Sequence, residues 1–131
     1  MKLILFFSIF IFSASANTGK WSALMKLIDQ EVATINKARK KTSHLKYRLL
    51  ELQSEKLKLW KQRENELFMK SSLKGKKISR RRAFKRTLSL YEKTRKQGLA
   101  IIRKHPKNQY RAAIYYTLAL NSRDYSYDDK E

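Results

Sequence analysis

The sequence contains no cysteine, one proline and three glycines, and its acids are far outnumbered by its bases. Without cysteine there is no disulfide framework, no thiolate metal site and no lipid-anchored N-terminal cysteine, so apolar packing must hold the fold. With so little proline and glycine, long helices meet few interruptions. The sequence has 31 lysines and arginines and 11 acids, which gives a formal charge of +20 over 131 residues. This charge favours polyanionic partners in general, although it is equally typical of proteins from a lysine-rich proteome.

Residues 1–16 have the three parts of a secretory signal peptide in order. Lys2 is followed by an apolar run over residues 3–12 and then by Ala14-Ser15-Ala16. The run is shorter than the roughly 20 residues that span a bilayer. We therefore expect cleavage after Ala16 and a periplasmic or secreted protein that is not a lipoprotein; an uncleaved anchor or a buried N-terminal helix is the alternative. Without Lys2 the charge is 30 minus 11, or +19.

The remaining sequence predicts an all-α protein, because helix-forming residues are abundant and no stretch alternates apolar with polar residues. We expect one long amphipathic or coiled-coil helix over residues 17–70. Its apolar seam repeats every three or four residues, but Glu31 and Lys56 interrupt it and disfavour a perfect parallel dimer. The seam therefore packs either in a coiled coil or against the rest of the chain. Its candidate packing residues are Trp21, Leu24, Ile28, Ile35, Leu45, Leu49, Leu52 and Leu59.

Residues 71–78 are expected to form a basic loop before a helical hairpin over residues 79–131. The first helix of the hairpin should begin after the N-cap Ser79 and end before Pro106, because proline cannot continue a helix. Asn108 can cap the second helix, predicted over residues 109–122. The expected buried face of the first helix is Phe84, Leu88, Tyr91, Gly98 or Leu99, and Ile102. That of the second is Tyr110, Ala113, Ile114, Tyr116, Thr117 and Leu118.

Residues 98–131 resemble the junction between tetratricopeptide repeats. A helix ends at Pro106, small and aromatic residues follow at Tyr110, Ala113 and Tyr116, and a turn is expected at Asp124-Tyr125-Ser126-Tyr127. The resemblance is closest to bacterial envelope proteins in which such repeats follow a coiled coil. It implies an incomplete array in this chain, since repeats bury their faces only against neighbours. A generic helical hairpin with a proline turn is the alternative.

The cations are densest between residues 74 and 86. The candidate polyanion contacts there are Lys74, Lys76, Lys77, Arg80, Arg81, Arg82, Lys85 and Arg86. Export would separate this tract from most nucleic acid, and helical spacing distributes its charges around the axis, so nucleic acid is the least favoured ligand. A solvated tract without a ligand is the most favoured interpretation, and an anionic envelope surface comes second.

No catalytic constellation is recognisable, and His44 and His105 lie far apart without an acidic partner nearby in the sequence. We therefore expect no enzymatic activity, no cofactor and no metal site. The leading functional hypothesis is an exported helical scaffold that binds another protein, or itself, in the bacterial cell envelope. The alternative is a polyanion-binding protein that uses residues 74–86 to contact anionic lipid, acidic glycan or nucleic acid.

Overall fold

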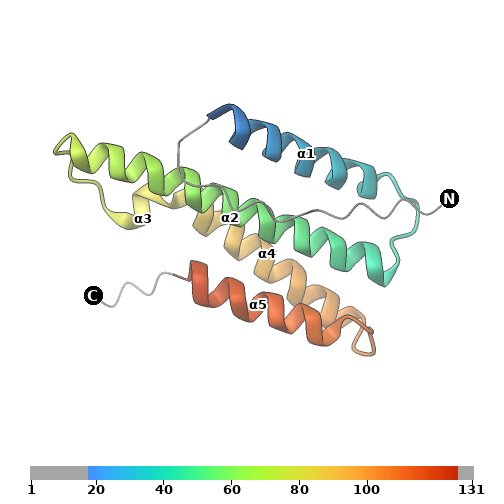
Figure 1. Ribbon diagram of the computed structural model, residues 1–131. Helices are drawn as coiled ribbons and strands as arrows, with labels where there is room; N and C mark the ends of the chain where they lie inside the picture. The colour runs from blue at the N-terminus through green and yellow to red at the C-terminus, as the bar shows by residue number, and fades with distance from the viewer. Residues whose placement is uncertain (1–17, 127–131) are drawn as a thin grey trace.

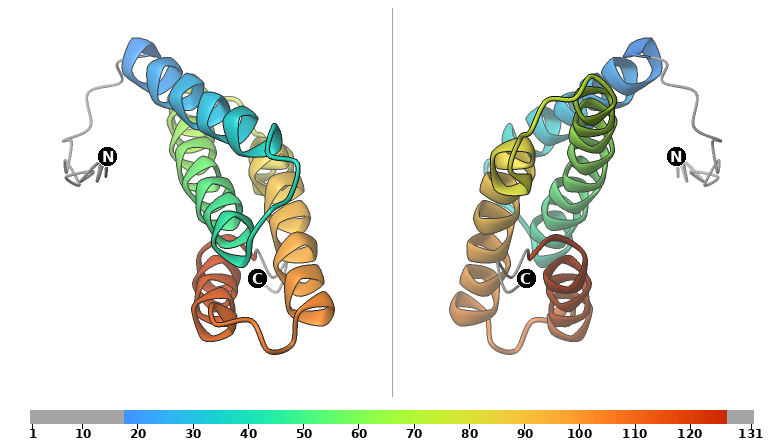
Figure 2. Two further views of the ribbon diagram at one scale, coloured as in Figure 1. Left: turned by 90° about the vertical axis from the view of Figure 1, so that its right-hand side faces the viewer. Right: turned by 90° about the vertical axis from the view of Figure 1, so that its left-hand side faces the viewer.

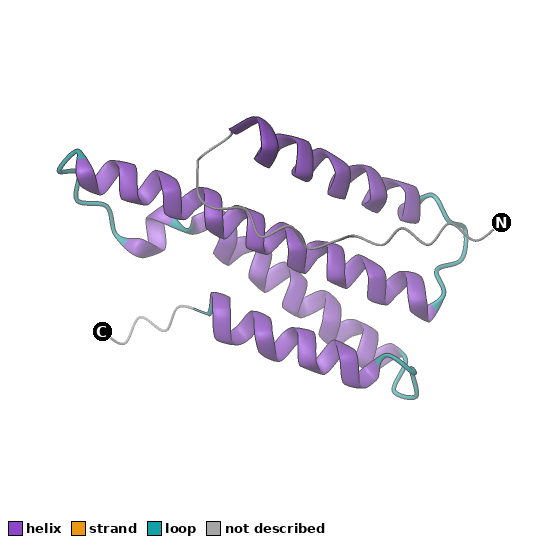
Figure 3. Ribbon diagram, viewed as in Figure 1, coloured by secondary structure: helices purple, strands orange, loops and turns teal. Residues whose placement is uncertain are grey.

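The structure is a computed structural model that describes residues 18–126, which fold into five α-helices (Figures 1 and 3). The helices are α1 (Thr18–Asn36), α2 (Ser43–Leu73), α3 (Arg80–Ala83), α4 (Lys85–Lys104) and α5 (Arg111–Tyr125). This part of the chain contains no strand, which confirms the predicted all-α class. The predicted signal peptide at residues 1–16 lies outside the described residues.

The longest helix, α2, runs through the centre of the molecule. It contacts α1 on one side and α3, α4 and α5 on the other, and α4 and α5 also pack together (Figures 1 and 2). Among the described helices, α1 packs on α2 alone. The architecture is therefore two helical hairpins, α1–α2 and α4–α5. The second hairpin packs on the side of α2 that α1 does not cover.

The prediction of one unbroken helix over residues 17–70 is wrong. The chain leaves the helix after Asn36 and reverses through residues 37–42, and α2 begins where Thr42 Oγ1 accepts a hydrogen bond from the backbone N–H of Leu45. Cations crowd this connection, and the like-charged pair Lys37 and Lys41, four residues apart, would destabilise a continuous helix. Reversal brings the two halves of the apolar seam face to face, which one straight helix cannot do within a monomer.

The seam residues form the core between α1 and α2. Ile28, Ile35 and Leu52 are buried, and Leu45, Leu49 and Leu59 pack against them. At the start of α1, Trp21 Nε1 donates to the carbonyl oxygen of Leu59 at 3.0 Å. The predicted seam is therefore used within the chain, between two antiparallel helices.

The two charged residues that interrupt the seam are paired across the same hairpin. Arg48 on α2 donates to both carboxylate oxygens of Glu31 on α1, at 2.7 and 3.1 Å, and this hydrogen bonding raises the pKa of Arg48. Lys56 Nζ lies 2.6 Å from Asp29 Oδ1. Pairs this exposed contribute little stability. They do match the antiparallel register, because a step back along α1 from Glu31 to Asp29 moves the partner forward along α2 from Arg48 to Lys56.

A second core joins α2 to the α4–α5 hairpin. Its two clusters centre on Leu50, Ile102 and Ile114 and on Leu57, Tyr91 and Tyr125. Gly98 lets α5 approach α4 closely, because a Cβ there would lie 2.7 Å from Leu118 Cδ2. On the predicted face of α4, Phe84, Tyr91, Gly98 and Ile102 are buried and Leu88 is half-buried.

Several helix ends differ from prediction by a few residues. The α2 helix continues to Leu73, and α5 runs from Arg111 to Tyr125, so Asp124 and Tyr125 are helical where a turn was expected. Ser79 does cap its helix, since its Oγ accepts from the N–H of Arg82. Asn108 forms its bond one step before α5, where its Oδ1 accepts from the N–H of Tyr110 at 2.8 Å. Tyr127, in the same expected turn, lies outside the described residues.

Candidate functional site

The end of the molecule where α2 turns into α3 carries the basic tract. We call this region the tip: the last two turns of α2, the loop at residues 74–79, α3 and the first turn of α4. It includes all eight predicted polyanion contacts together with Lys70, and each of these cations is exposed. The sequence contains no acid between Glu66 and Glu92. The tip therefore presents positive charge without a carboxylate of its own.

The loop at the tip has a defined conformation that begins with a glycine helix cap. Gly75 has φ 71°, the left-handed conformation that L side chains disfavour. The N–H of Gly75 donates to the carbonyl of Ser72 at 2.9 Å, and the N–H of Lys76 donates to that of Ser71 at 3.1 Å. These two bonds are the pair that defines a Schellman cap. These bonds satisfy two of the last carbonyl groups of α2 and set the direction in which the loop leaves the helix.

A buried carboxylate from α2 caps the other side of the tip. Glu64 accepts hydrogen bonds from the backbone N–H groups of Arg86 and Thr87, both at 3.0 Å, and from Thr87 Oγ1 at 2.6 Å. These are the second and third N–H groups of α4, which no side chain of the capping residue Phe84 satisfies. The negative charge of Glu64 also lies at the positive end of the α4 dipole. It offsets the surrounding cations, which are unfavourable at the N-terminus of a helix.

Aromatic rings support the tip where it joins the bundle. Phe84 is buried and lies against Phe68, with ring centroids 5.9 Å apart. The guanidinium of Arg86 stacks over Trp60 at 4.7 Å, and Trp60 meets Trp21 of α1 edge-on at 4.9 Å. Phe84 is the aromatic ring within the basic tract, and its burial leaves it unable to stack on a nucleic-acid base.

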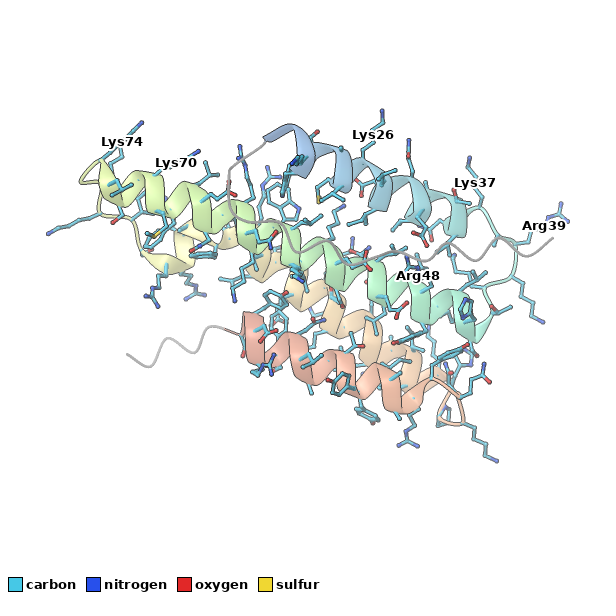
Figure 4. All side chains as sticks on the ribbon, viewed as in Figure 1. Lys26, Lys37, Arg39, Arg48, Lys70 and Lys74 are labelled. Carbon is cyan, nitrogen blue, oxygen red and sulfur yellow. The ribbon has the colours of Figure 1, made fainter. Side chains whose placement is uncertain are left out.

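Exposed apolar side chains stand among the cations of the tip. Leu73, the last residue of α2, is 84 % exposed, and Met69 and Leu67 are about half exposed. At about 100° per residue, these three and the lysines at 70 and 74 share an arc of about 160° on the last turns of α2. The two labelled lysines, Lys70 and Lys74, extend outward at this end in Figure 4. The sequence shows the cations as a run but does not show this apolar component, because Leu67 lies in the predicted long helix and Leu73 in the predicted basic loop.

A hollow of about 410 Å³ lies beside the tip. Its lining includes Arg81 and Lys85 on the basic side, with Leu88 and Tyr91 as its apolar wall. Glu92 lies on the lining as well, and its carboxylate is 3.9 Å from Arg95. An anionic group would therefore be held at the Arg81 and Lys85 side of the hollow, away from Glu92.

The predicted packing residues differ in how far they are exposed. Trp21, Ala113 and Tyr110 are half-buried, and the ring of Tyr110 stacks on Tyr47 at 5.0 Å. In contrast, Leu24 is 44 % exposed and Tyr116 is 67 % exposed, so the expectation that these two are packed is wrong for the described residues. Both lie on outer helix faces, α1 and α5, that no described helix covers.

The described residues include no group of three or more His, Asp or Glu side chains placed to hold a metal ion. The imidazoles of His44 and His105 are each used locally: His44 Nδ1 lies 3.1 Å from the hydroxyl of Tyr110, and His105 Nε2 lies 2.6 Å from Lys46 Nζ. No helix within residues 18–126 is both long enough and apolar enough to cross a membrane.

Comparison with known protein families, with curated proteins and with solved structures finds no match to this chain.

Proposed function

We propose that this protein binds the surface of anionic membranes through the tip. The observation that carries the proposal is the exposed, acid-free cluster of cations that surrounds the exposed side chains of Leu73 and Met69. Basic residues near an anionic bilayer contribute about 1 kcal/mol each, and apolar side chains add affinity by entering the headgroup region. The cap at Gly75 sets the direction in which the loop that carries Lys76 and Lys77 leaves α2, directly after Leu73.

The apolar component favours lipid over the other polyanions. A glycan or a nucleic-acid backbone would meet the lysines and arginines but would leave Leu73 in water. Sequence-tolerant binding of single strands also relies on exposed aromatic rings, and Phe84 is buried. The hollow beside Arg81 and Lys85 is large enough for a phosphate headgroup, and its wall of Leu88 and Tyr91 suits the adjoining glycerol and acyl groups.

The electrostatic part of the proposal is tested with a variant in which Lys74, Lys76, Lys77 and Arg82 are all replaced by glutamine. Removing four cations at about 1 kcal/mol each should lower affinity for phosphatidylglycerol vesicles by roughly 100-fold or more. The matched control replaces Lys26, Lys58, Lys93 and Lys96, exposed lysines in the middle of the bundle, so that net charge falls equally. Vesicle sedimentation measures both variants. Equal losses would show that net charge alone drives binding, and would overturn the tip as the site.

The lipid part is tested with Leu73→Ser. Loss of the leucine side chain that would enter the bilayer should weaken vesicle binding about tenfold while leaving heparin binding unchanged, because a glycan offers no apolar region for residue 73 to enter. Leu27→Ser on α1 is the control, since Leu27 is 52 % exposed and lies outside the tip. If the protein binds heparin and vesicles alike, and Leu73→Ser changes neither, the ligand is a polyanion without a lipid component.

The N-terminal pattern supports export as the route to such a surface. We propose that residues 1–16 direct secretion and are removed after Ala16, so that the tip meets the anionic lipid of the envelope outside the cytoplasm. The N-terminal residue of the exported protein decides this point: Asn17 supports it, and Met1 contradicts it.

A second candidate function is docking of a protein partner on the outer face of α5. Tyr115 and Tyr116 are exposed there, at 46 % and 67 %, and aromatic residues are enriched at protein interfaces. This face is where the resemblance to tetratricopeptide repeats would place a following helix.

The structure does not favour self-association through the α1–α2 seam, because those side chains pack within the chain. Light scattering on the exported protein should therefore show a monomer, and a stable dimer would contradict this assignment of the seam.

A further inference from the structure

The acids of the described chain are confined to the middle of the molecule. Ion pairs and hydrogen bonds place them there: Asp29 meets Lys56, Glu31 meets Arg48, and Glu64 meets the start of α4. Burial, opposed by Arg48, raises the pKa of Glu55 in the same region. The complete set is Asp29, Glu31, Glu51, Glu55, Glu64, Glu66, Glu92 and Asp124. Both ends of the bundle are therefore free of the described acids.

The end opposite the tip is also basic, and it is assembled from two connections that are far apart in the sequence. Contacts between His44 and Tyr110 and between Lys46 and His105 join the start of α2 to the connection between α4 and α5. We call this region the loop end. Its cations are Lys37, Arg39, Lys40, Lys41, Lys46, Arg103, Lys104, Lys107 and Arg111. Figure 4 shows Lys37 and Arg39 extending from this end, with Lys70 and Lys74 at the other.

The loop end contains a groove of about 300 Å³ between α1 and α4, with α2 as its floor. Val32, Leu49, Leu50 and Ile101 give it an apolar base, and Lys46 and Lys104 are among its lining residues. No acid lines it. This combination of an apolar base with nearby ammonium groups suits an anionic headgroup and the first part of its acyl chain.

The two basic ends are too far apart to act as one electrostatic site. The 31 residues of α2 span about 46 Å at 1.5 Å per residue, whereas charges are screened over about 8 Å at physiological ionic strength. Leu73 ends α2 at the tip, so contact of the tip alone with a bilayer leaves the loop end at the far end of α2. The loop end then faces outward, beyond the middle region that contains the acids.

We propose that the loop end is a second anionic-lipid site and that the protein bridges two anionic membrane surfaces. This inference rests on the proposed binding by the tip, since it assigns the opposite end the same ligand chemistry. A molecule lying flat would bring both ends to one surface and would not connect two vesicles, so vesicle aggregation distinguishes bridging from flat binding.

The experiment measures both binding and aggregation of phosphatidylglycerol vesicles, by sedimentation and turbidity. Three variants of the full exported protein each exchange four cations for glutamine: the tip set (Lys74, Lys76, Lys77 and Arg82), a loop-end set (Lys37, Arg39, Lys40 and Lys41) and the middle set (Lys26, Lys58, Lys93 and Lys96). All three lower net charge equally, and circular dichroism checks that each retains its helices. Phosphatidylcholine vesicles provide the neutral surface.

We expect the loop-end variant to bind vesicles within about threefold of the native protein while losing most vesicle aggregation, because a single remaining site cannot connect two surfaces. The tip variant should lose aggregation and bind much more weakly, because only the loop end remains to contact lipid, and the middle variant should keep both binding and aggregation. Aggregation by the loop-end variant at the native level would overturn the bridging proposal and leave binding by the tip intact. Binding of the native protein without aggregation would do the same. Absence of vesicle binding by the native protein would overturn both proposals.

Discussion

Replacing Glu64 by alanine is expected to lower the free energy of unfolding by about 3 kcal/mol, because it leaves buried donors without an acceptor. The carboxylate takes three hydrogen bonds, from the N–H groups of Arg86 and Thr87 and from the Thr87 hydroxyl. Glu64 and Thr87 are buried, so water cannot fully replace the lost acceptor. The substitution also removes a negative charge from the positive end of the α4 dipole, in a region where the nearby side chains are cationic.

The size of the effect is measured by urea unfolding, with Glu66→Ala as the control. Glu66 lies on the same helix, but it is partly exposed and its contact is a 3.5 Å ion pair with Arg63, so its loss should cost about 0.5 kcal/mol or less. Glu64→Gln keeps a carbonyl oxygen but loses the charge, and it should fall between the two. Equal stability of Glu64→Ala and Glu66→Ala would show that the start of α4 does not depend on α2. Hydrogen exchange at Arg86 and Thr87 then locates the change.

Replacing Leu57 by alanine is expected to cost about 3 kcal/mol, within the range that leucine-to-alanine substitutions show in protein cores. Leu57 has no exposed surface and meets Tyr91 and Tyr125 where α2, α4 and α5 converge. The end of α5 is held at the same place, because Lys61 Nζ donates to the carbonyl oxygen of Asp124 and lies 5.2 Å from the centre of the Tyr125 ring. A cavity at residue 57 would therefore loosen all three helices.

Leu73→Ala is the matched control for Leu57→Ala, since both change a leucine of α2. Leu73 is 84 % exposed, and its substitution should shift the free energy of unfolding by about 0.5 kcal/mol or less. Denaturant midpoints of the two variants are compared with that of the native protein. If they coincide, the face of α2 that carries Leu57 does not pack against the α4–α5 hairpin. The same control shows that Leu73 can be changed for binding experiments without loss of the fold.

Local chemistry made much of the fold predictable. The apolar spacing and abundant helix formers predicted an all-α protein, Pro106 set the end of α4, and Ser79 was identified as a cap. The break at residues 37–42 was missed because the apolar spacing continues across it, from Ile35 to Leu45. Thr42 was the available signal, since threonine is a preferred N-cap and here it is a polar residue in a mostly apolar seam.

The candidate site was likewise only partly predictable from the sequence. The basic tract was evident as a run of cations, but its apolar component was not, because the exposure of Leu73 depends on where α2 ends. The loop end was missed entirely, since it joins residues 37–46 to residues 103–111 only after folding. The packing assigned to Leu24 and Tyr116 was wrong because helical spacing identifies a face but does not guarantee that another helix covers it.

The sequence by itself determined the helical class, the excess of positive charge and most of the residues that form the core. These properties follow from local propensity and from spacing along one helix. Tertiary structure decided that the long apolar seam closes on itself as a hairpin, that Glu64 caps a helix beginning more than 20 residues later in the chain, and that the acids gather in the middle between two basic ends. Those outcomes depend on which helix faces meet in space, because burial of apolar surface and pairing of charge are satisfied only between segments distant in the sequence.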